Sequence, residues 1–112
     1  MNILVCDDDR EIVNAIEIYL SNEGYTIFKA YDGLEALNIV EKEELHLIIM
    51  DVMMPKMDGL RATMRIREEN NIPIIILSAK SEDYDKITGL NVGADDYITK
   101  PFNPLELIAR VK

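Results

Sequence analysis

Basic residues are scarce in this chain: 12 Lys and Arg stand against 21 Asp and Glu, for a formal net charge of -9. This balance argues against a nucleic-acid-binding surface on these residues, because phosphate groups bind basic faces. Cysteine is rarer still. The single Cys6 excludes an internal disulfide, and its position inside an apolar run indicates a buried packing residue.

Long apolar segments are also missing. No run approaches the length of a membrane-spanning helix and no signal peptide is visible, so we expect a cytoplasmic protein without membrane contact. The 112 residues suit one compact domain, and 48% hydrophobic with 29% charged residues is usual for a globular protein.

Short apolar runs alternate with longer amphipathic stretches, which predicts an α/β fold. The expected strands are 2–6, 25–30, 46–51, 73–78 and 95–99, with helices between them and after the last. Such alternation with short connections implies a parallel sheet, helices on both of its faces and right-handed crossovers.

Side chains that can accept hydrogen bonds from free backbone N–H groups mark the expected helix starts. Asp32 with Glu35 three residues later has the capping-box pattern, and Asn103 precedes Pro104 at a helix start. The remaining candidate caps are Asp9, Asp58 and Ser81.

The last helix is expected to turn Leu105, Ile108 and Val111 toward the core. This apolar face continues as far as Val111, and no capping glycine or proline follows it. We therefore expect the domain to be part of a longer protein.

Acidic residues stand at the ends of two expected strands. Asp7 and Asp8 follow the run 2–6, and Asp51 ends the run 46–51. Ligands of open α/β sheets bind at the carboxyl ends of the strands, so we expect these carboxylates to meet there. Carboxylates held so near one another repel, which is unfavourable unless a bound cation or a proton neutralises part of their charge. A hard divalent ion with oxygen ligands, Mg²⁺ before others, suits the set.

Two further polar residues end strands at the same edge. Ser78 ends the fourth expected strand and Lys100 follows the fifth. A hydroxyl, an ammonium and a metal ion together would hold a phosphoryl group, and a carboxylate can be its acceptor. The combination favours phosphoryl transfer to an aspartate, which needs mostly positioning and charge neutralisation.

The chain resembles the response-regulator receiver domains of two-component signalling over its whole length. The matching segments are 3–9, 50–55 with 57–59, 73–79 and 93–102. The resemblance implies one receiver domain over residues 1–112, with a doubly wound, flavodoxin-like (CheY-like) fold. Its five-stranded parallel sheet should have the order 2-1-3-4-5, with helices on both faces.

By this resemblance, Asp51 is the phosphoacceptor, and a sensor histidine kinase is the donor. Asp7 and Asp8, together with Asp51 and the backbone carbonyl of Met53, are expected to bind Mg²⁺. A receiver domain catalyses only its own phosphorylation and dephosphorylation, so no separate enzymatic activity is expected.

Three other residues take family roles by the same resemblance. Lys100 pairs with the acceptor carboxylate and then with the phosphoryl oxygens, and its bond to Pro101 is expected to be cis. Ser78 takes the switch hydroxyl position, and Tyr97 the aromatic switch position.

Two positions that influence dephosphorylation in the family depart from its usual residues. Met53 stands two residues after the acceptor, and Lys80 stands two after the switch hydroxyl. Because the Met53 side chain has no group to orient an attacking water, we expect slow self-dephosphorylation.

Residues 85–97 and 106–110 resemble the OmpR/PhoB subfamily, which dimerises on activation through the face made by the fourth helix, the fifth strand and the last helix. The expected contacts are Lys86 with Glu106 of the partner subunit, Asp96 with Arg110 of the partner subunit, and Leu90 at the apolar centre. The chain also resembles VanR-type regulators. In this subfamily a winged-helix DNA-binding domain follows the receiver, so DNA binding is expected only of a longer parent protein.

Other functions fit the residues less well. Asp7 and Asp9 have the spacing of a haloacid-dehalogenase-type phosphatase motif, but Arg10 follows where that motif has Thr or Val. A dinucleotide-binding fold would need a Gly-x-Gly-x-x-Gly turn after the first strand, which is Asp-rich here. A pseudo-receiver that signals without phosphate stays open, although the complete set of site residues speaks against it.

Overall fold

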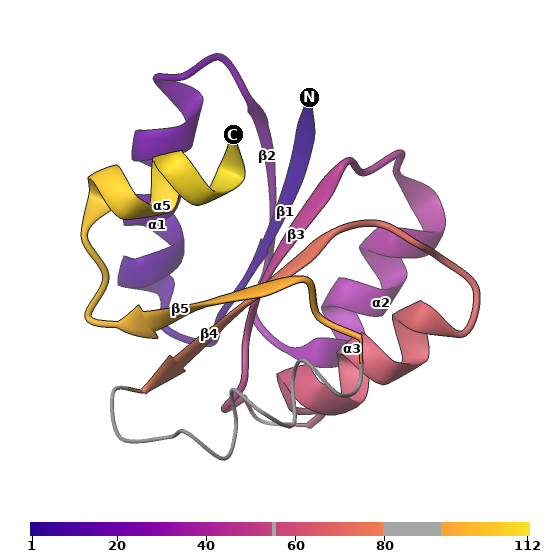
Figure 1. Ribbon diagram of the computed structural model, residues 1–112. Coiled ribbons are helices and arrows are strands. Elements are labelled where there is room, and N and C mark those ends of the chain that lie inside the picture. The colour runs from indigo at the N-terminus through magenta and orange to yellow at the C-terminus, as the bar shows by residue number, and fades with distance from the viewer. Residues whose placement is uncertain (55, 80–92) are drawn as a thin grey trace.

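The computed structural model has a parallel five-stranded sheet in the order β2-β1-β3-β4-β5 (Figure 1). The structure describes residues 1–54, 56–79 and 93–112. The strands are β1 Asn2–Cys6, β2 Thr26–Ala30, β3 Leu47–Asp51, β4 Ile74–Ala79 and β5 Asp96–Lys100. The expected strands are thus confirmed, with ends that differ by one residue at most.

Helices cover both faces of the sheet. They are α1 Arg10–Ser21, α2 Gly33–Lys42, α3 Gly59–Arg67 and α5 Pro104–Val111. In Figure 1, α1 and α5 lie against one face, and α2 and α3 lie against the other. This arrangement confirms the flavodoxin-like fold and the strand order that the sequence predicts.

Strand side chains alternate between two apolar clusters, one under each pair of helices. In β1, Leu4 and Cys6 belong to the cluster beneath α2 and α3, whereas Ile3 and Val5 belong to the one beneath α1 and α5. All four are fully buried. Burial on both faces explains why the central strands read as continuous apolar runs instead of alternating patterns.

Each described helix begins at a predicted cap. Asp9 accepts from the N–H of Glu11 at 3.0 Å, Asp58 from Arg61 at 2.8 Å, and Asn103 from Leu105 at 2.8 Å. Asp32 accepts from the N–H of Glu35 at 2.9 Å, while the Glu35 carboxylate accepts from Tyr31, one residue before the cap. The candidate cap Ser81 lies outside the described residues.

The expected apolar face of the last helix is wrong at its first position. Leu107 and Val111 are buried, whereas the Leu105 side chain is 75% exposed. Leu107, Ile108 and Val111 form the stripe that contacts the sheet, and Leu105 lies on another side of the helix because each residue turns the helix by about 100°.

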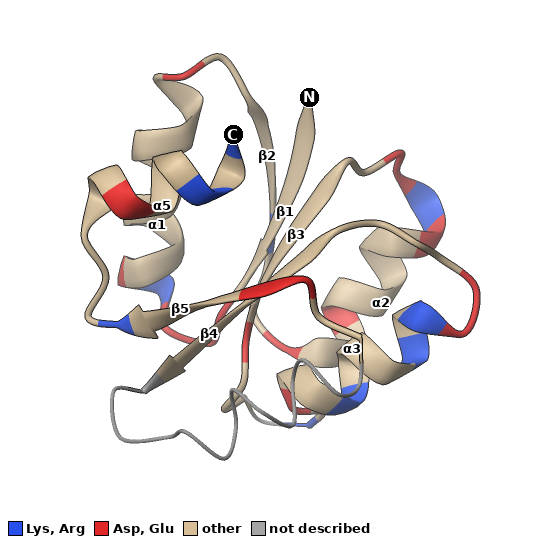
Figure 2. Cartoon of the chain, in the orientation of Figure 1, with Lys and Arg blue, Asp and Glu red and all other residues tan. Residues whose placement is uncertain are grey.

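In the parts of the chain that the structure describes, no helix is long and apolar enough to cross a membrane. Acidic and basic positions both lie on α1, α2 and α5, whereas α3 carries Arg61, Arg65 and Arg67 and no acidic residue (Figure 2). Over the whole chain, acidic residues outnumber basic ones by 21 to 12.

Candidate functional site

Three carboxylates meet where β1 and β3 end. These strands are neighbours in register, with Cys6 opposite Met50, so the residues that follow them, Asp7 and Asp51, emerge side by side. Carboxylate oxygens of Asp7, Asp8 and Asp51 lie within 4.8 Å of one another. Asp7 and Asp51 are buried, at 0% and 4% exposed, while Asp8 is exposed.

Lys100 bridges the two buried carboxylates from the end of β5. Its Nζ lies 2.7 Å from Oδ2 of Asp7 and 2.9 Å from Oδ1 of Asp51. The Lys100–Pro101 peptide is cis, as the family resemblance predicts. One ammonium therefore neutralises part of the charge that two buried carboxylates bring to the site.

This single cation does not offset the whole effect of burial. Burial raises the pKa of Asp51 to about 6, opposed by the Lys100 hydrogen bond and supported by the negative charges of Asp7 and Asp8. Burial also raises the pKa of Asp7, although Lys100 and the N–H of Asp9 donate hydrogen bonds to its carboxylate. The site thus favours binding of a further cation.

The same charges hold the proton on Lys100. Burial alone would lower the pKa of this ammonium, but the hydrogen bonds to Asp7 and Asp51 outweigh it, and the pKa lies above its ordinary value. Lys100 is therefore a permanent positive charge in the site.

Ser78 contributes a buried hydroxyl from β4, between β3 and β5. The side chain is 2% exposed, and its Oγ has no hydrogen-bond partner among the described residues. Leaving a buried hydroxyl unpaired costs roughly 1–3 kcal/mol. Such a group has a donor available for an anion that binds at this edge of the sheet.

A family model described as the response regulator receiver domain matches residues 3–112. The chain belongs to this family. The match decides against the haloacid-dehalogenase-type phosphatase and the dinucleotide-binding fold, the first of which rested only on the spacing of Asp7 and Asp9.

Regulators of known name share this receiver domain at high identity. The regulatory protein VanR of Enterococcus faecium is 54% identical over 110 residues, which are 98% of this chain and 48% of VanR. The response regulator GtcR of Aneurinibacillus migulanus is 48% identical over 98% of this chain and 46% of its own. The chain thus spans about half the length of these relatives, and the resemblance to VanR-type regulators is confirmed.

Solved structures show the same fold. A putative response regulator from Chloroflexus aurantiacus superposes with a TM-score of 0.95 at 37% identity, over 99% of this chain and 93% of its own. The receiver domain of Francisella response regulator 1452 gives 0.92 at 42% identity, over 98% and 92% of the two chains. Receiver domains are signalling modules of two-component systems, switched by phosphorylation, and they generally bind Mg²⁺ at an acidic pocket such as this one.

Two other residues that the sequence singles out are more exposed than the buried carboxylates of Asp7 and Asp51. Tyr97 lies within β5, opposite Ile76 of β4, and is 36% exposed. Met53, two residues after Asp51, has a side chain that is 70% exposed.

The expected subunit contacts fall partly outside the described residues, where Lys86 and Leu90 lie. Glu106 is exposed in the first turn of α5. Arg110 pairs with Asp96 of its own chain, with Nη1 2.9 Å from Oδ1 and 2.7 Å from Oδ2. The charge pair that the sequence assigns to two subunits therefore forms within one chain, and the contact between subunits stays a prediction.

Some contacts near the site were not predicted from the sequence. Arg10 stacks its guanidinium 3.9 Å from the centre of the Tyr31 ring, a cation–π contact beside the acidic cluster. Lys56 reaches the buried cap Asp32 at 3.6 Å. No sequence signal marks either contact, because each joins residues that are far apart in the sequence.

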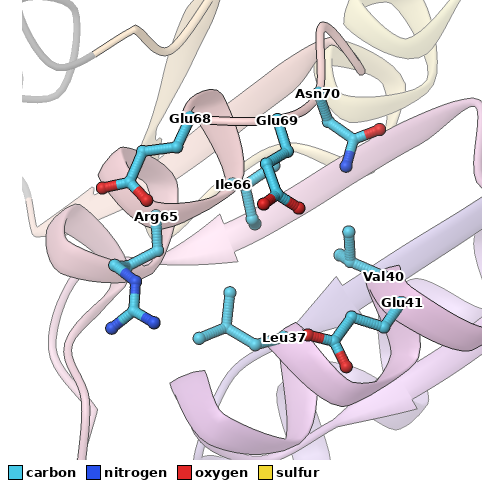
Figure 3. Close-up of a pocket in the computed structure, with 8 residues that line it drawn as sticks. All are labelled: Leu37, Val40, Glu41, Arg65, Ile66, Glu68, Glu69 and Asn70. Atoms are coloured by element: carbon cyan, nitrogen blue, oxygen red, sulfur yellow. The ribbon is translucent and has the colours of Figure 1, made fainter.

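Of two hollows on the described surface of the receiver domain, one adjoins the site and the other does not. A largely apolar groove runs from Lys100 and Pro101 along Ile12 and Tyr19 of α1. The other opens between α2 and α3, with Leu37, Val40 and Ile66 among its lining residues (Figure 3). This second hollow contains none of the site residues.

Proposed function

We propose that this receiver domain accepts a phosphoryl group on Asp51 from a sensor histidine kinase in the cytoplasm. The observation that carries the proposal is the set of three carboxylates with oxygens within 4.8 Å of one another. This donor set fits Mg²⁺, which prefers oxygen ligands and offsets repulsion between carboxylates. Asp7, Asp8 and Asp51 would hold it, with the backbone carbonyl of Met53.

Each neighbouring group has a task in the transfer. An oxygen of Asp51 forms a bond to phosphorus while the bond to the histidine nitrogen breaks, and the imidazole keeps that electron pair. Lys100, already 2.9 Å from Asp51, stays beside the new acyl phosphate and pairs with a phosphoryl oxygen. Bound Mg²⁺ would supply further charge neutralisation. Ser78 donates its unpartnered hydroxyl to another phosphoryl oxygen.

The phosphorylated state then shifts the population of the domain. Ser78 moves toward the phosphoryl group, and Tyr97 turns inward into the space that it leaves. The face that includes β5 and α5 changes, and two copies associate through it about a two-fold axis. In a longer parent protein this dimer would control a winged-helix DNA-binding domain and hence transcription.

Intact mass after incubation with acetyl phosphate and Mg²⁺ tests the acceptor. We expect one added phosphoryl group on the wild type and none on Asp51→Asn or without Mg²⁺. Asp9→Asn is the matched control, because it removes an acid next to the cluster while keeping a side chain that caps α1.

The same labelling experiment also tests the remaining alternative, a pseudo-receiver that signals without phosphate. If the wild type gains no phosphoryl group from acetyl phosphate, transfer from a phosphorylated histidine kinase is measured next. Failure with both donors would identify a pseudo-receiver and contradict the proposal.

A further inference from the structure

The segment between β3 and α3 directly follows the proposed phosphoacceptor. We call residues 52–58 the acceptor loop; all of them except Pro55 are described. Met53, whose carbonyl is a proposed ligand, lies in this loop. Any contact that holds the acceptor loop in place therefore also holds part of the proposed cation site.

The start of α2 is one surface that holds the acceptor loop. The N–H of Gly33 donates to the carbonyl oxygen of Met57 at 3.2 Å. A Cβ at Gly33 would lie 2.5 Å from that oxygen, so only glycine allows the two backbones to approach this closely.

The end of β1 is a second such surface. The buried Cys6 thiol lies 3.4 Å from Sδ of Met54 and 3.3 Å from the carbonyl oxygen of Asp32. Burial and the negative charges of Asp32 and Asp7 raise the pKa of this thiol, so Cys6 remains a neutral donor. It links the acceptor loop to the strand that leads to Asp7.

An ion pair completes the attachment. Oδ1 of Asp32 accepts the helix-capping bond from Glu35, and Oδ2 lies 3.6 Å from Nζ of Lys56. The Asp32 side chain is 7% exposed, so its charge is poorly solvated without this ammonium.

Lys56 also has an unfavourable backbone conformation. Its φ is 65°, in the left-handed region that residues with a side chain rarely adopt and glycine adopts freely. A backbone that suits glycine is thus occupied by a residue whose ammonium reaches Asp32, which suggests a role for the side chain.

We propose that Lys56 and Asp32 are positioning residues that fix the acceptor loop on α2 and thereby strengthen Mg²⁺ binding. This inference rests on the proposed function of the carboxylate site. Electrostatics alone predicts the opposite sign for Lys56, because loss of a positive charge near an acidic cluster should tighten cation binding. A Lys56 variant can therefore distinguish positioning from the general effect of charge.

Lys56→Gly is the decisive variant, because it removes the ammonium and also suits the left-handed backbone. Its stability in urea should match or exceed that of the wild type. Titration calorimetry should nevertheless give a Mg²⁺ dissociation constant roughly threefold to tenfold higher. Lys56→Arg, which keeps the charge, should restore most of the affinity.

Two further measurements make the test specific. Lys29→Gln is the matched control, since it removes an ammonium that pairs with Glu17 at 3.3 Å between β2 and α1. It should leave Mg²⁺ affinity unchanged or tighten it slightly. In metal-free protein, hydrogen exchange at the Gly33 amide should be faster in Lys56→Gly than in the wild type and in Lys29→Gln.

Asp32→Asn tests the other member of the pair, because asparagine still caps α2. If the two residues act together, Asp32→Asn should weaken Mg²⁺ binding much less in the Lys56→Gly background than in the wild type. Mg²⁺ binding by Lys56→Gly that is equal to or tighter than wild-type binding would overturn the inference alone. A wild type that binds no Mg²⁺ would instead overturn the proposed cation site and this role with it.

Discussion

At the scale of single residues, burial destabilises the charged form of the Asp51 carboxylate in the metal-free protein. Its pKa lies at about 6, above the ordinary value of 3.8, because burial disfavours the charged carboxylate. The folded state therefore holds this proton to a higher pH than the unfolded chain. The contribution of Asp51 to stability is greatest below about pH 4 and falls as pH rises through about 6.

Replacement of Asp51 by asparagine should remove this pH-dependent loss. Without Mg²⁺ at pH 7, we expect Asp51→Asn to have a free energy of unfolding higher than the wild type by about 1–3 kcal/mol. At pH 4 the difference should be smaller. Urea unfolding at both pH values measures it, and a difference that does not grow from pH 4 to pH 7 would contradict the raised pKa.

We expect Met53 to influence how long the phosphoryl group persists on the proposed acceptor. Its side chain is 70% exposed beside the acceptor and has no hydrogen-bonding group that could orient a water molecule. We expect Met53→Asn to lose the phosphoryl group several-fold faster than the wild type, as followed by intact mass over time.

Met64→Asn provides the control for this change. Met64 is also an exposed methionine, at 51%, but it lies within α3 and not in the loop that follows Asp51. An equal lifetime for the wild type and Met53→Asn would count against a role of Met53 in dephosphorylation.

At the scale of elements, the start of α3 is in direct contact with the backbone that carries the acceptor. The N–H of Gly59 donates to the carbonyl of Val52 at 2.9 Å. A Cβ at Gly59 would lie only 1.9 Å from the carbonyl oxygen of Asp51. The absence of a side chain at Gly59 thus sets the distance between α3 and the end of β3.

Gly59→Ala should therefore destabilise the domain by roughly 1–3 kcal/mol and slow phosphorylation, because α3 must move away from Asp51. Gly24→Ala is the control. Gly24 has a φ of 90° but nothing within 4 Å of an added Cβ, so we expect backbone strain without a change in phosphorylation rate. Urea unfolding and acetyl-phosphate labelling follow the two effects separately, and normal labelling of Gly59→Ala would contradict the expected displacement.

The elements also show what could be predicted from the sequence. Asp7, Asp51, Ser78 and Lys100 could be grouped because each ends a strand or directly follows one, and parallel strands place such residues at one edge. The helix caps could be predicted from the sequence equally well, since a cap acts within one helical turn. They are Asp9, Asp32, Asp58 and Asn103. Patterns along the chain were therefore sufficient to predict both the strand-end residues and the helix caps.

Contacts between loops were harder to predict from the sequence. The Lys56–Asp32 pair depends on how the acceptor loop folds back onto α2, which no periodic pattern encodes. Leu105 was misplaced because its spacing fits a helical face, whereas the buried stripe of α5 centres on Leu107 and Val111 and leaves Leu105 on another side of the helix. For Asp96 and Arg110, the charges suit contacts within one chain and between two, and the sequence does not distinguish them.

At the scale of the whole molecule, the Asp96–Arg110 pair limits how much ion pairing can stabilise a dimer. Arg110 already has a partner in its own chain, 2.7 Å away, so association exchanges one exposed pair for another. The net gain should be small, since water and salt screen exposed ion pairs.

We therefore expect Arg110→Ala to weaken the phosphorylated dimer by no more than about tenfold, without changing the rate of phosphorylation. Sedimentation equilibrium of phosphorylated protein measures the dissociation constant. Lys112→Ala, which removes a pair with Glu23 at 3.2 Å, is the matched control. Equal dimer affinity in all three proteins would fit the exchange of one exposed pair for another, whereas a loss well beyond tenfold would contradict it and mean that the pair does more than orient the subunits.

The hydrogen bond between Lys100 and Asp7 joins residues that are 93 positions apart. A chain emerging from the ribosome exposes Asp7 and Asp51 long before Lys100, so the partly made domain has its acids together without their ammonium. Loop-closure entropy delays such distant contacts until the intervening chain has collapsed. We therefore expect the domain to become able to accept a phosphoryl group only after β5 has been made, and a chain that stops before β5 not to be phosphorylated.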